Sequence, residues 1–331
     1  MKPATYDIIA IGNALVDVLA PATDDFIASE GLTRGAMQLV EPDRATQLYS
    51  RMGPAREISG GSAGNTVAGA AMLGARCAFI GQVAQDQLGE VFMHDLRSQG
   101  IAFSVPARTP DVPTGRCLIL VSPDGQRTMN TSLGAAQFLP PSAIEEQQVA
   151  SAKVLLLEGY LWDPLQPREA MRTAIAMARR AGRQVALGVS AVFCIHNHLD
   201  DFRALLDRRD IDILFTNEEE LMALAGTDEF EAAVTAIAPK VTVLVATRGA
   251  AGAIAVAGGQ RFEVPAEPVH RVVDTTGAGD LFSAGYLVGH VQGKPVETCL
   301  RMGAIAAAEI ISHYGARPER DLKELMEQSL A

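Results

Sequence analysis

Short apolar segments alternate with helical patterns from about residue 150 onward, and this alternation restricts the fold more than any other feature. The apolar segments are nearly continuous runs of Val, Ile and Leu, as in strands that are buried on both faces. Helical spacing follows them, for example over 167–181, where Gly182 ends the pattern. The sequence therefore predicts an α/β fold with a doubly wound, mainly parallel sheet, whose ligands bind at the carboxyl ends of the strands. The strands expected in this part of the chain are 154–157, 185–187, 211–215 and 241–245.

The first 150 residues follow a different pattern. Residues 8–11 predict one more buried strand. The pattern over 114–130 is instead typical of a β-hairpin, with its turn at Pro123-Asp124-Gly125. We interpret a segment near 105–130 that contains this hairpin, together with segments near 13–20 and 33–40, as a small β-strand lid on the main sheet. Because no long linker interrupts the sequence, we expect a single domain over residues 1–331 that includes this lid.

The charge balance argues against a nucleic-acid partner. The chain has 28 Lys and Arg against 39 Asp and Glu, a formal net charge of -11, so it lacks a general attraction to phosphate backbones. Charged residues interrupt the apolar runs before they reach the roughly 20 residues that cross a bilayer. Asp7 and Asp17 interrupt the N-terminal stretch in the same way, and we interpret it as a strand and not as a signal peptide. With four widely spaced cysteines, these features predict a cytoplasmic protein that binds no membrane.

The most informative segment is Asp274-Thr275-Thr276-Gly277-Ala278-Gly279-Asp280, which leads into a helical pattern that runs to Val291. Small residues at a helix start leave backbone N–H groups uncovered, and the helix dipole then favours an anion such as phosphate. A carboxylate beside a phosphate is unfavourable unless it has a chemical task, so Asp280 is a candidate base for a hydroxyl proton. The alternative is a glycine-rich loop in which Asp280 only stabilises the helix start.

A second glycine-rich helix start spans Ser59 to Thr66. Gly60 and Gly61 would let a polyol or ribose approach the backbone closely, and Asn65 can both donate to and accept from hydroxyls. Tight packing of a helix on a sheet would explain the same glycines equally well. Asp17 is a carboxylate in an otherwise apolar strand, which makes it either an acceptor for two neighbouring hydroxyls or a residue that marks the strand end.

Two polar segments come after predicted strands: Thr-Asn-Glu-Glu-Glu at 216–220 directly follows one, and Thr-Arg-Gly-Ala-Ala-Gly at 247–252 comes after the next. Both lie where an α/β sheet binds ligands, and they indicate a nucleotide site. The chain has no Walker A pattern, and it has no GxGxxG after its first strand because Gly12 is followed by Asn13 and Ala14. A P-loop or a dinucleotide site is therefore not expected.

The two glycine-rich segments, Gly60-Gly61-Ser62-x-x-Asn65 and Asp274-Thr275-x-Gly277-Ala278-Gly279-Asp280, resemble the two signatures of the ribokinase-like, or PfkB, carbohydrate kinase family. Their order and separation fit over nearly the whole chain. The resemblance implies a ribokinase-like fold and an enzyme that moves the γ-phosphoryl group of ATP to a hydroxymethyl group of its substrate. The stretches Gly12–Asp17 and Met37-Gln38-Leu39 look most like the adenosine kinase branch, which implies the conversion of adenosine to AMP.

The resemblance also implies roles for individual residues. It makes Asp280 the catalytic base and the backbone of Gly277, Ala278 and Gly279 its anion hole. The substrate contacts that it implies are Asn13, Asp17, Gln38, Gly60, Gly61 and Asn65, with Arg127 on the lid facing the phosphate. The nucleotide contacts that it implies are Asn217, Glu220, Thr247, Gly249 and Gly252, of which Glu220 also holds Mg²⁺ through water. In many members a monovalent cation lies near the positions of Asp274 and Thr276, so K⁺ is a further candidate.

The choice of substrate stays more open than the reaction. The resemblance implies an aromatic residue that stacks on the nucleobase of the substrate. Tyr160, Leu161 and Trp162 lie in the matching region, and the sequence does not say which of them points inward. A kinase of a sugar or sugar acid, of the ribose, fructose or ketodeoxygluconate type, would use Asp17, Gly61 and Asn65 just as well. A non-catalytic nucleoside-binding protein would keep the fold without the reaction. Both a monomer and a homodimer are compatible with the sequence.

Overall fold

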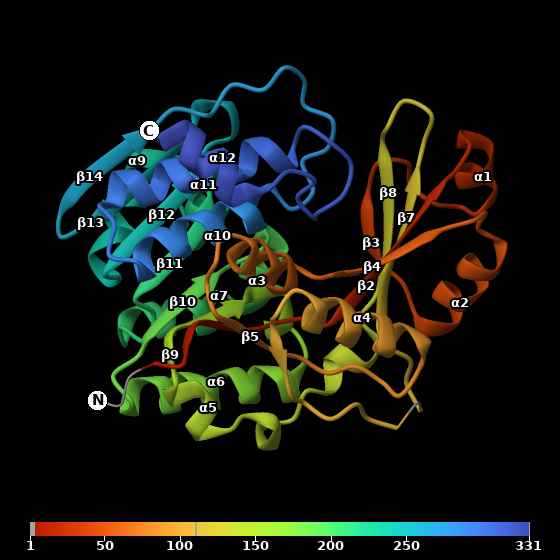
Figure 1. Cartoon of the computed structure of the whole chain (residues 1–331), viewed down its shortest axis with the longest axis horizontal. Coiled ribbons are helices and arrows are strands. Elements are labelled where there is room, and N and C mark those ends of the chain that lie inside the picture. Colours follow the sequence, from red (N-terminus) through yellow and green to blue (C-terminus); the bar gives the residue numbers. More distant parts are fainter. Residues whose placement is uncertain (1–3, 110, 331) are drawn as a thin grey trace.

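The structure of the chain is a computed structural model that describes residues 4–109 and 111–330. The single domain is predicted over residues 1–331, and five of these residues, 1–3, 110 and 331, lie outside the described range. Within that range, a large sheet between two layers of helices stands beside a smaller sheet (Figure 1). The predicted α/β fold, with a large and mainly parallel sheet and a small second sheet, is confirmed.

The large sheet has the strand order β14-β13-β12-β11-β10-β9-β1-β5-β6. Neighbouring strands from β12 to β6 run parallel, whereas β13 and β14 form an antiparallel edge. The strands expected from the sequence are present, although β11 and β12 begin at 213 and 243 instead of 211 and 241. The bounds are β1 (Tyr6–Ile11), β5 (Cys77–Ile80), β6 (Ala102–Phe103), β9 (Ala152–Glu158), β10 (Gln184–Gly188), β11 (Ile213–Asn217), β12 (Val243–Thr247), β13 (Ala253–Ala257) and β14 (Gln260–Val264).

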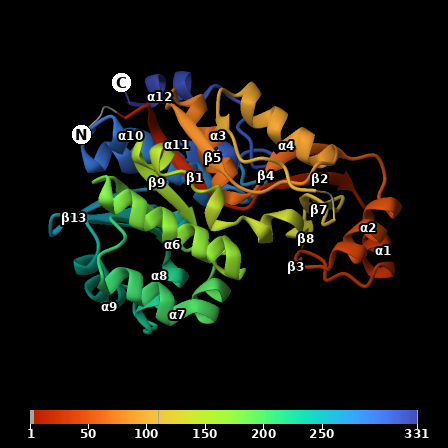
Figure 2. The same cartoon turned by 90° about the horizontal axis from the view of Figure 1, so that it is seen from below.

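Helices cover both faces of the large sheet (Figure 2). α3, α10 and α11 pack on one face, and α6, α7 and α8 lie on the other. None of the helices in the described part of the chain is long and apolar enough to cross a membrane. The bounds are α1 (Asp24–Ser29), α2 (Pro42–Arg51), α3 (Ser62–Met72), α4 (Gln87–Ser98), α5 (Glu146–Ala150), α6 (Leu165–Arg180), α7 (Val192–Asp207), α8 (Glu218–Ala225), α9 (Phe230–Ile237), α10 (Ala278–Val291), α11 (Val296–Ile310) and α12 (Leu322–Leu330). Short 3-10 helices are η1 (Gly134–Phe138), η2 (Pro141–Ala143), η3 (Gly159–Trp162), η4 (Ala238–Lys240) and η5 (Gly249–Ala251).

The smaller sheet has the order β3-β8-β7-β2-β4, and α1 and α2 lie on its outer side (Figure 1). The hairpin expected at 114–130 forms β7 and β8, and the segments near 13–20 and 33–40 supply β2 and β3. Residues 105–109 come before this sheet, and Arg108 forms an isolated bridge with Ala84. The sequence did not predict β4, a short strand that pairs antiparallel with β2. The bounds are β2 (Leu15–Pro21), β3 (Met37–Leu39), β4 (Arg56–Gly60), β7 (Gly115–Val121) and β8 (Arg127–Ser132).

Candidate active site

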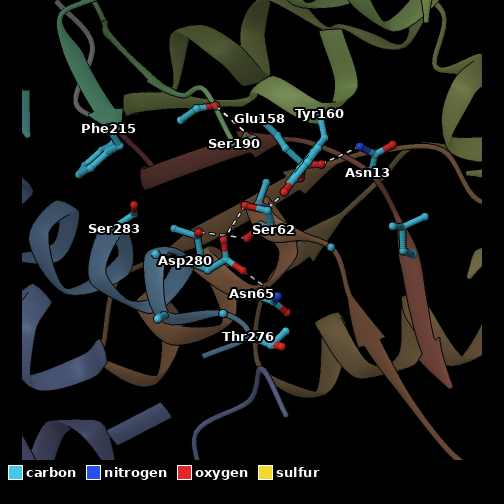
Figure 3. A pocket seen from close by; sticks show the side chains of 18 of the residues that line it. Asn13, Ser62, Asn65, Glu158, Tyr160, Ser190, Phe215, Thr276, Asp280 and Ser283 are labelled. Carbon is cyan, nitrogen blue, oxygen red and sulfur yellow. Dashed lines mark hydrogen bonds between the residues drawn. The ribbon is translucent and has the colours of Figure 1, made fainter. Parts of the chain in front are cut away.

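A cavity of about 530 Å³ lies between the carboxyl edge of the large sheet and the small sheet. The last residues of four neighbouring strands line it, namely Glu158, Gly188, Asn217 and Thr247. The first turns of α3 and α10 also line it, and Figure 3 shows their side chains pointing toward one another. The cavity thus occupies the edge at which a sheet of this topology is expected to bind ligands.

Asp280 projects into this cavity from the first turn of α10 (Figure 3). Its Oδ1 accepts a hydrogen bond from Ser62 Oγ at 2.5 Å, and its Oδ2 accepts one from Asn65 Nδ2 at 2.9 Å. Burial raises the pKa of the Asp280 carboxyl group, while the two hydrogen bonds and the charge of Arg317 oppose this rise. A carboxylate with two donors still has lone pairs to spare, so Asp280 can accept a further proton from a ligand.

The backbone before Asp280 forms the start of α10. Gly277 has a φ of 79°, a left-handed conformation that residues with a Cβ rarely adopt. A Cβ at this position would also stand 2.9 Å from the Cβ of Ala316, so space as well as conformation requires glycine. No side chain in the described residues caps this helix, which leaves the N–H groups of its first turn available to an anion. Gly277, Ala278 and Gly279 all line the cavity.

Asp17 lies on β2 and lines the cavity on the side of the small sheet. Protein surrounds its carboxyl group, and this burial raises its pKa to about 6, although the charges of Arg317 and Arg127 oppose the rise. Gly60, on the paired strand β4, makes room for it, because a Cβ at 60 would stand 2.5 Å from the carboxylate. Gly60 itself does not line the cavity, whereas Gly61 does. The Asp17 carboxylate has no hydrogen-bond partner among the described residues, so both oxygens are free to accept from a ligand.

Glu158, the last residue of β9, is a site residue that the sequence analysis missed. It is buried, and it accepts hydrogen bonds from Asn13 Nδ2 at 2.6 Å and from the Ala63 backbone N–H at 2.8 Å. Burial raises its pKa to about 7 against these two hydrogen bonds. The contact also orients Asn13, whose Oδ1 is buried without a partner among the described residues and can accept from a ligand. A carboxylate at the end of a predicted parallel strand was the signal that would have found Glu158.

Asn217 and Glu220 form the start of α8 at the other end of the cavity. Asn217 Oδ1 accepts from the backbone N–H of Glu220 at 2.8 Å, and the Glu220 carboxylate accepts from the backbone N–H of Asn217 at 2.9 Å. Burial raises the pKa of Glu220 to about 6. Both residues and Thr247 line the cavity, whereas Gly249 and Gly252 shape the turn after β12 and do not.

The small sheet gives the cavity an apolar wall. Met37 and Leu39 are 42% and 56% exposed and line the cavity. Gln38 lies between them on β3, and because successive strand residues face opposite sides, it points away and donates to Asn130 Oδ1 at 2.8 Å. The predicted substrate contact at Gln38 is therefore not part of the cavity lining, and its two neighbours are. Further apolar residues of this wall are Leu15, Cys117, Met129 and Leu133.

Tyr160 is the residue of its segment that faces the cavity (Figure 3). Leu161 and Trp162 are fully buried in the core, and Trp162 Nε1 donates to Asp201 at 3.1 Å. The Tyr160 ring packs against the ring of Phe193, which also lines the cavity, with centroids 5.9 Å apart. The two rings offer an aromatic surface, of which the sequence analysis expected Tyr160 as one of three candidates and did not expect Phe193.

Arg127 and Asp274 form a buried ion pair between the small sheet and the segment before α10. Arg127 Nη2 lies 2.8 Å from Asp274 Oδ2, and the guanidinium stands over the Tyr314 ring, with Cζ 5.4 Å from the centroid. The two Asp274 oxygens also accept from the backbone N–H groups of Thr276 and Gly315, each at 3.1 Å. Thr276 lines the cavity, whereas Arg127 and Asp274 do not. The K⁺ site expected at Asp274 and Thr276 stays a prediction, and Arg127 already supplies a positive charge to the Asp274 carboxylate.

Arg317 is a second functional candidate that the sequence analysis missed. It lies in the loop between α11 and α12 and donates to Asn65 Oδ1 at 2.7 Å and to Ser59 Oγ at 2.9 Å. Its enclosure by protein lowers its pKa to about 10, while the nearby carboxylates Asp17, Asp95 and Asp280 raise it. Nothing local in the sequence pointed to this residue, because its partners lie more than 250 residues away in the chain.

Comparisons with known proteins agree on one family. Residues 29–322 match the family described as pfkB family carbohydrate kinase. The structure of an adenosine kinase from Sinorhizobium meliloti is 44% identical, with a TM-score of 0.91, and the match covers 98% of this chain and all of that one. The structure of a probable sugar kinase protein from Rhizobium etli CFN 42 is 42% identical, with a TM-score of 0.92, over 98% of this chain and 99% of that one. The adenosine kinase of Saccharomyces cerevisiae is 26% identical over 94% of this chain and 96% of its own length.

The Arg127–Asp274 pair predicts a thermal stability that does not depend on K⁺. The midpoint of thermal unfolding should be equal in KCl and in choline chloride of the same ionic strength, because Arg127 already neutralises Asp274. Arg127→Met leaves the Asp274 carboxylate buried without its cation and should lower the free energy of unfolding by about 3–5 kcal/mol. In that variant, we expect KCl to raise the midpoint relative to choline chloride.

Arg320→Met is the matched control, since Arg320 is exposed and belongs to the same part of the chain as Gly315. It should behave like the wild-type protein in both salts. A wild-type midpoint that rises specifically with K⁺ would contradict this prediction, because it would show that Arg127 does not take the place of a cation at Asp274.

Proposed function

Since the chain belongs to the pfkB family of carbohydrate kinases, we propose that it phosphorylates adenosine. The family makes it an ATP-dependent kinase of a small molecule with a hydroxyl acceptor. The proposed reaction moves the γ-phosphoryl group of ATP to the 5′-hydroxymethyl group of adenosine and gives AMP and ADP. The resemblance to two adenosine kinases, one of them 44% identical, supports this choice.

The observation that carries the proposal is the division of the cavity into a polar and an apolar part. Asn13, Asp17 and Asn65 offer acceptors and donors at one end, as the hydroxyls of a ribose require. Met37 and Leu39 expose apolar side chains beside them, and a free sugar has no apolar ring to cover this surface. A nucleoside has both a polyol and an aromatic base, so it matches both parts.

The chemistry follows from the position of Asp280. Its carboxylate takes the proton of the 5′-hydroxyl, and the oxygen attacks the γ-phosphorus as the bond to ADP breaks. The N–H groups at the start of α10 stabilise the charge on the transferred phosphoryl group. Ser62 and Asn65 hold the carboxylate in place, which keeps the base aligned with the hydroxyl. The small sheet acts as a lid that keeps water from the phosphoryl group and so limits hydrolysis of ATP.

Asn217 and Glu220 are the residues that would hold Mg²⁺. The described residues contain no group of three or more His, Cys, Asp or Glu side chains that could hold a metal, so phosphate oxygens and water must supply most of the ligands. The Glu220 carboxylate lines the cavity at the end opposite the small sheet and can bind the waters of such an ion. Magnesium, when bound, neutralises charge on the phosphates of ATP.

A sugar or sugar-acid kinase is the second candidate function. The polar end of the cavity would hold a sugar without help from the apolar wall, and the probable sugar kinase from Rhizobium etli is 42% identical to this chain. A non-catalytic nucleoside-binding protein is disfavoured, because the candidate base and the uncapped helix start lie together in the cavity.

A substrate panel tests the proposal. ADP release with ATP and Mg²⁺ should give a higher kcat/KM for adenosine than for ribose, fructose or ketodeoxygluconate. Leu39→Ser removes part of the apolar wall and should lower kcat/KM for adenosine roughly tenfold or more, with little change for ribose. Gln38→Ser is the matched control, since Gln38 points away from the cavity and should leave the ratio unchanged. A free sugar that exceeds adenosine in kcat/KM would refute the adenosine proposal.

The position of Asp17 leads us to expect that the protein discriminates between adenosine and 2′-deoxyadenosine. A carboxylate with two free oxygens receives two neighbouring hydroxyls, and a missing hydroxyl leaves one buried oxygen unpaired. The wild-type protein should therefore prefer adenosine to 2′-deoxyadenosine in kcat/KM, by up to roughly 10⁴-fold. Asp17→Ala should be poor with both and nearly indifferent between them. An unchanged preference ratio in a folded Asp17→Ala variant would remove Asp17 from the substrate site.

A further inference from the structure

The loop between α11 and α12 carries Arg317, whose guanidinium contacts a hydrogen-bond partner of the proposed base Asp280. Arg317 donates to Asn65 Oδ1 at 2.7 Å and to Ser59 Oγ at 2.9 Å. Asn65 in turn donates to Asp280 at 2.9 Å. The order of these contacts is a chain from Arg317 through Asn65 to Asp280, and it joins three segments that are far apart in the sequence.

The contact with Arg317 settles which way the Asn65 amide faces. A guanidinium has only N–H donors, so it must meet the oxygen of the amide and not its NH₂ group. The NH₂ group then faces Asp280, where it can only donate. Without Arg317, the amide could rotate and turn its oxygen toward the carboxylate, which would repel it. Arg317 is thus placed to impose on Asn65 the one orientation that supports Asp280.

The charge of Arg317 has a second effect, since the site is rich in carboxylates. Asp17 and Asp280 lie on two sides of the cavity, and Asp95 accepts a hydrogen bond from the Ser59 backbone N–H at 2.8 Å. ATP would add further negative charge. Arg317 lowers the pKa of both Asp17 and Asp280 against the effect of burial, so it favours their charged forms.

Several contacts fix the loop that carries Arg317. Glu309, buried at the end of α11, accepts from the backbone N–H groups of Glu319 and Arg320, both at 3.0 Å. On the other side, Gly315 donates its backbone N–H to Asp274 at 3.1 Å. These contacts hold the loop at both ends. They therefore fix the backbone from which the Arg317 side chain extends.

We propose that Arg317 is a positioning residue for Asp280: it fixes the orientation of the Asn65 amide, and its charge keeps the base in its ionised form. The proposal rests on the proposed function, in which Asp280 takes the proton of the acceptor hydroxyl. Arg317 does not line the cavity and need not touch the substrate. Its removal should therefore act on kcat more than on the KM for the acceptor.

Arg317→Met tests this role. We expect kcat to fall roughly 10- to 100-fold at neutral pH with a much smaller change in the KM for the acceptor. Because the positive charge lowers the pKa of Asp280, its loss should move the acid limb of the kcat/KM profile to higher pH. The titratable groups that face Asp280 are Asp17, Glu158, Tyr160 and Arg317, and burial raises the pKa of Tyr160 far above the range of the acid limb. Arg317→Lys keeps the charge and should return the acid limb toward the wild-type position.

A double-mutant cycle shows whether Arg317 acts through Asn65. In an Asn65→Leu background, Arg317→Met should lower kcat far less than it does in the wild-type background. Arg320→Met controls for the loss of a surface charge from the same loop. Thermal melting and binding of ATP identify any variant that does not fold, and Arg317→Lys then carries the test.

Two outcomes would overturn the proposal. One is an Arg317→Met variant with wild-type kcat and an unmoved acid limb, and the other is an equal loss in both backgrounds of the cycle. The assays use whichever acceptor the wild-type enzyme prefers, so a failure of the adenosine proposal leaves this test intact. A failure of Asp280 as the base would appear separately, as an Asp280→Asn variant that retains its turnover.

Discussion

The close packing of α3 on α10 is the constraint on which the rest of the site depends. Gly69 of α3 faces α10, and a Cβ there would stand 2.5 Å from Leu281 Cδ1 and 3.1 Å from the Cβ of Ala284. Because small residues let the two helices approach, their first turns meet at the edge of the cavity. Ser62 and Asp280, which are 218 residues apart in the sequence, can then form a hydrogen bond. Of the two glycines near 60, Gly60 makes room for the Asp17 carboxylate, whereas Gly61 lines the cavity and lies close to the backbone oxygen of Asn13.

Enclosed carboxyl groups dominate the electrostatics of the cavity. Burial raises the pKa of Asp17 to about 6 and that of Glu158 to about 7, and it also raises the pKa of Asp280. The two arginines that offset this negative charge come from outside the large sheet, Arg127 from β8 and Arg317 from the loop before α12. The charge balance of the site is therefore complete only when the small sheet and this loop are both in place against the large sheet.

Much of the fold could be predicted because its signals are local. Apolar runs such as 154–157 identify buried strands, and a glycine-rich segment before a helical pattern identifies the start of α10. It is harder to predict which face of a sheet a strand residue points to. Gln38 was assigned to the site, but its neighbours Met37 and Leu39 line the cavity instead. β4 escaped notice because Arg56–Gly60 is short and has no long apolar run. Arg317 and Phe193 could not be found, since their partners come together only in the folded chain.

Asp280 as the general base is the central claim, and the rate of a single turnover tests it most directly. Enzyme in excess would be loaded with adenosine, mixed rapidly with ATP and Mg²⁺, and quenched to measure AMP. Because the substituted amide can keep the contact with Ser62 but cannot take a proton, Asp280→Asn should bind both ligands with near wild-type affinity. Its rate of AMP formation should be lower by roughly 10²- to 10⁴-fold or more. A single-turnover rate close to that of the wild-type enzyme would contradict the account.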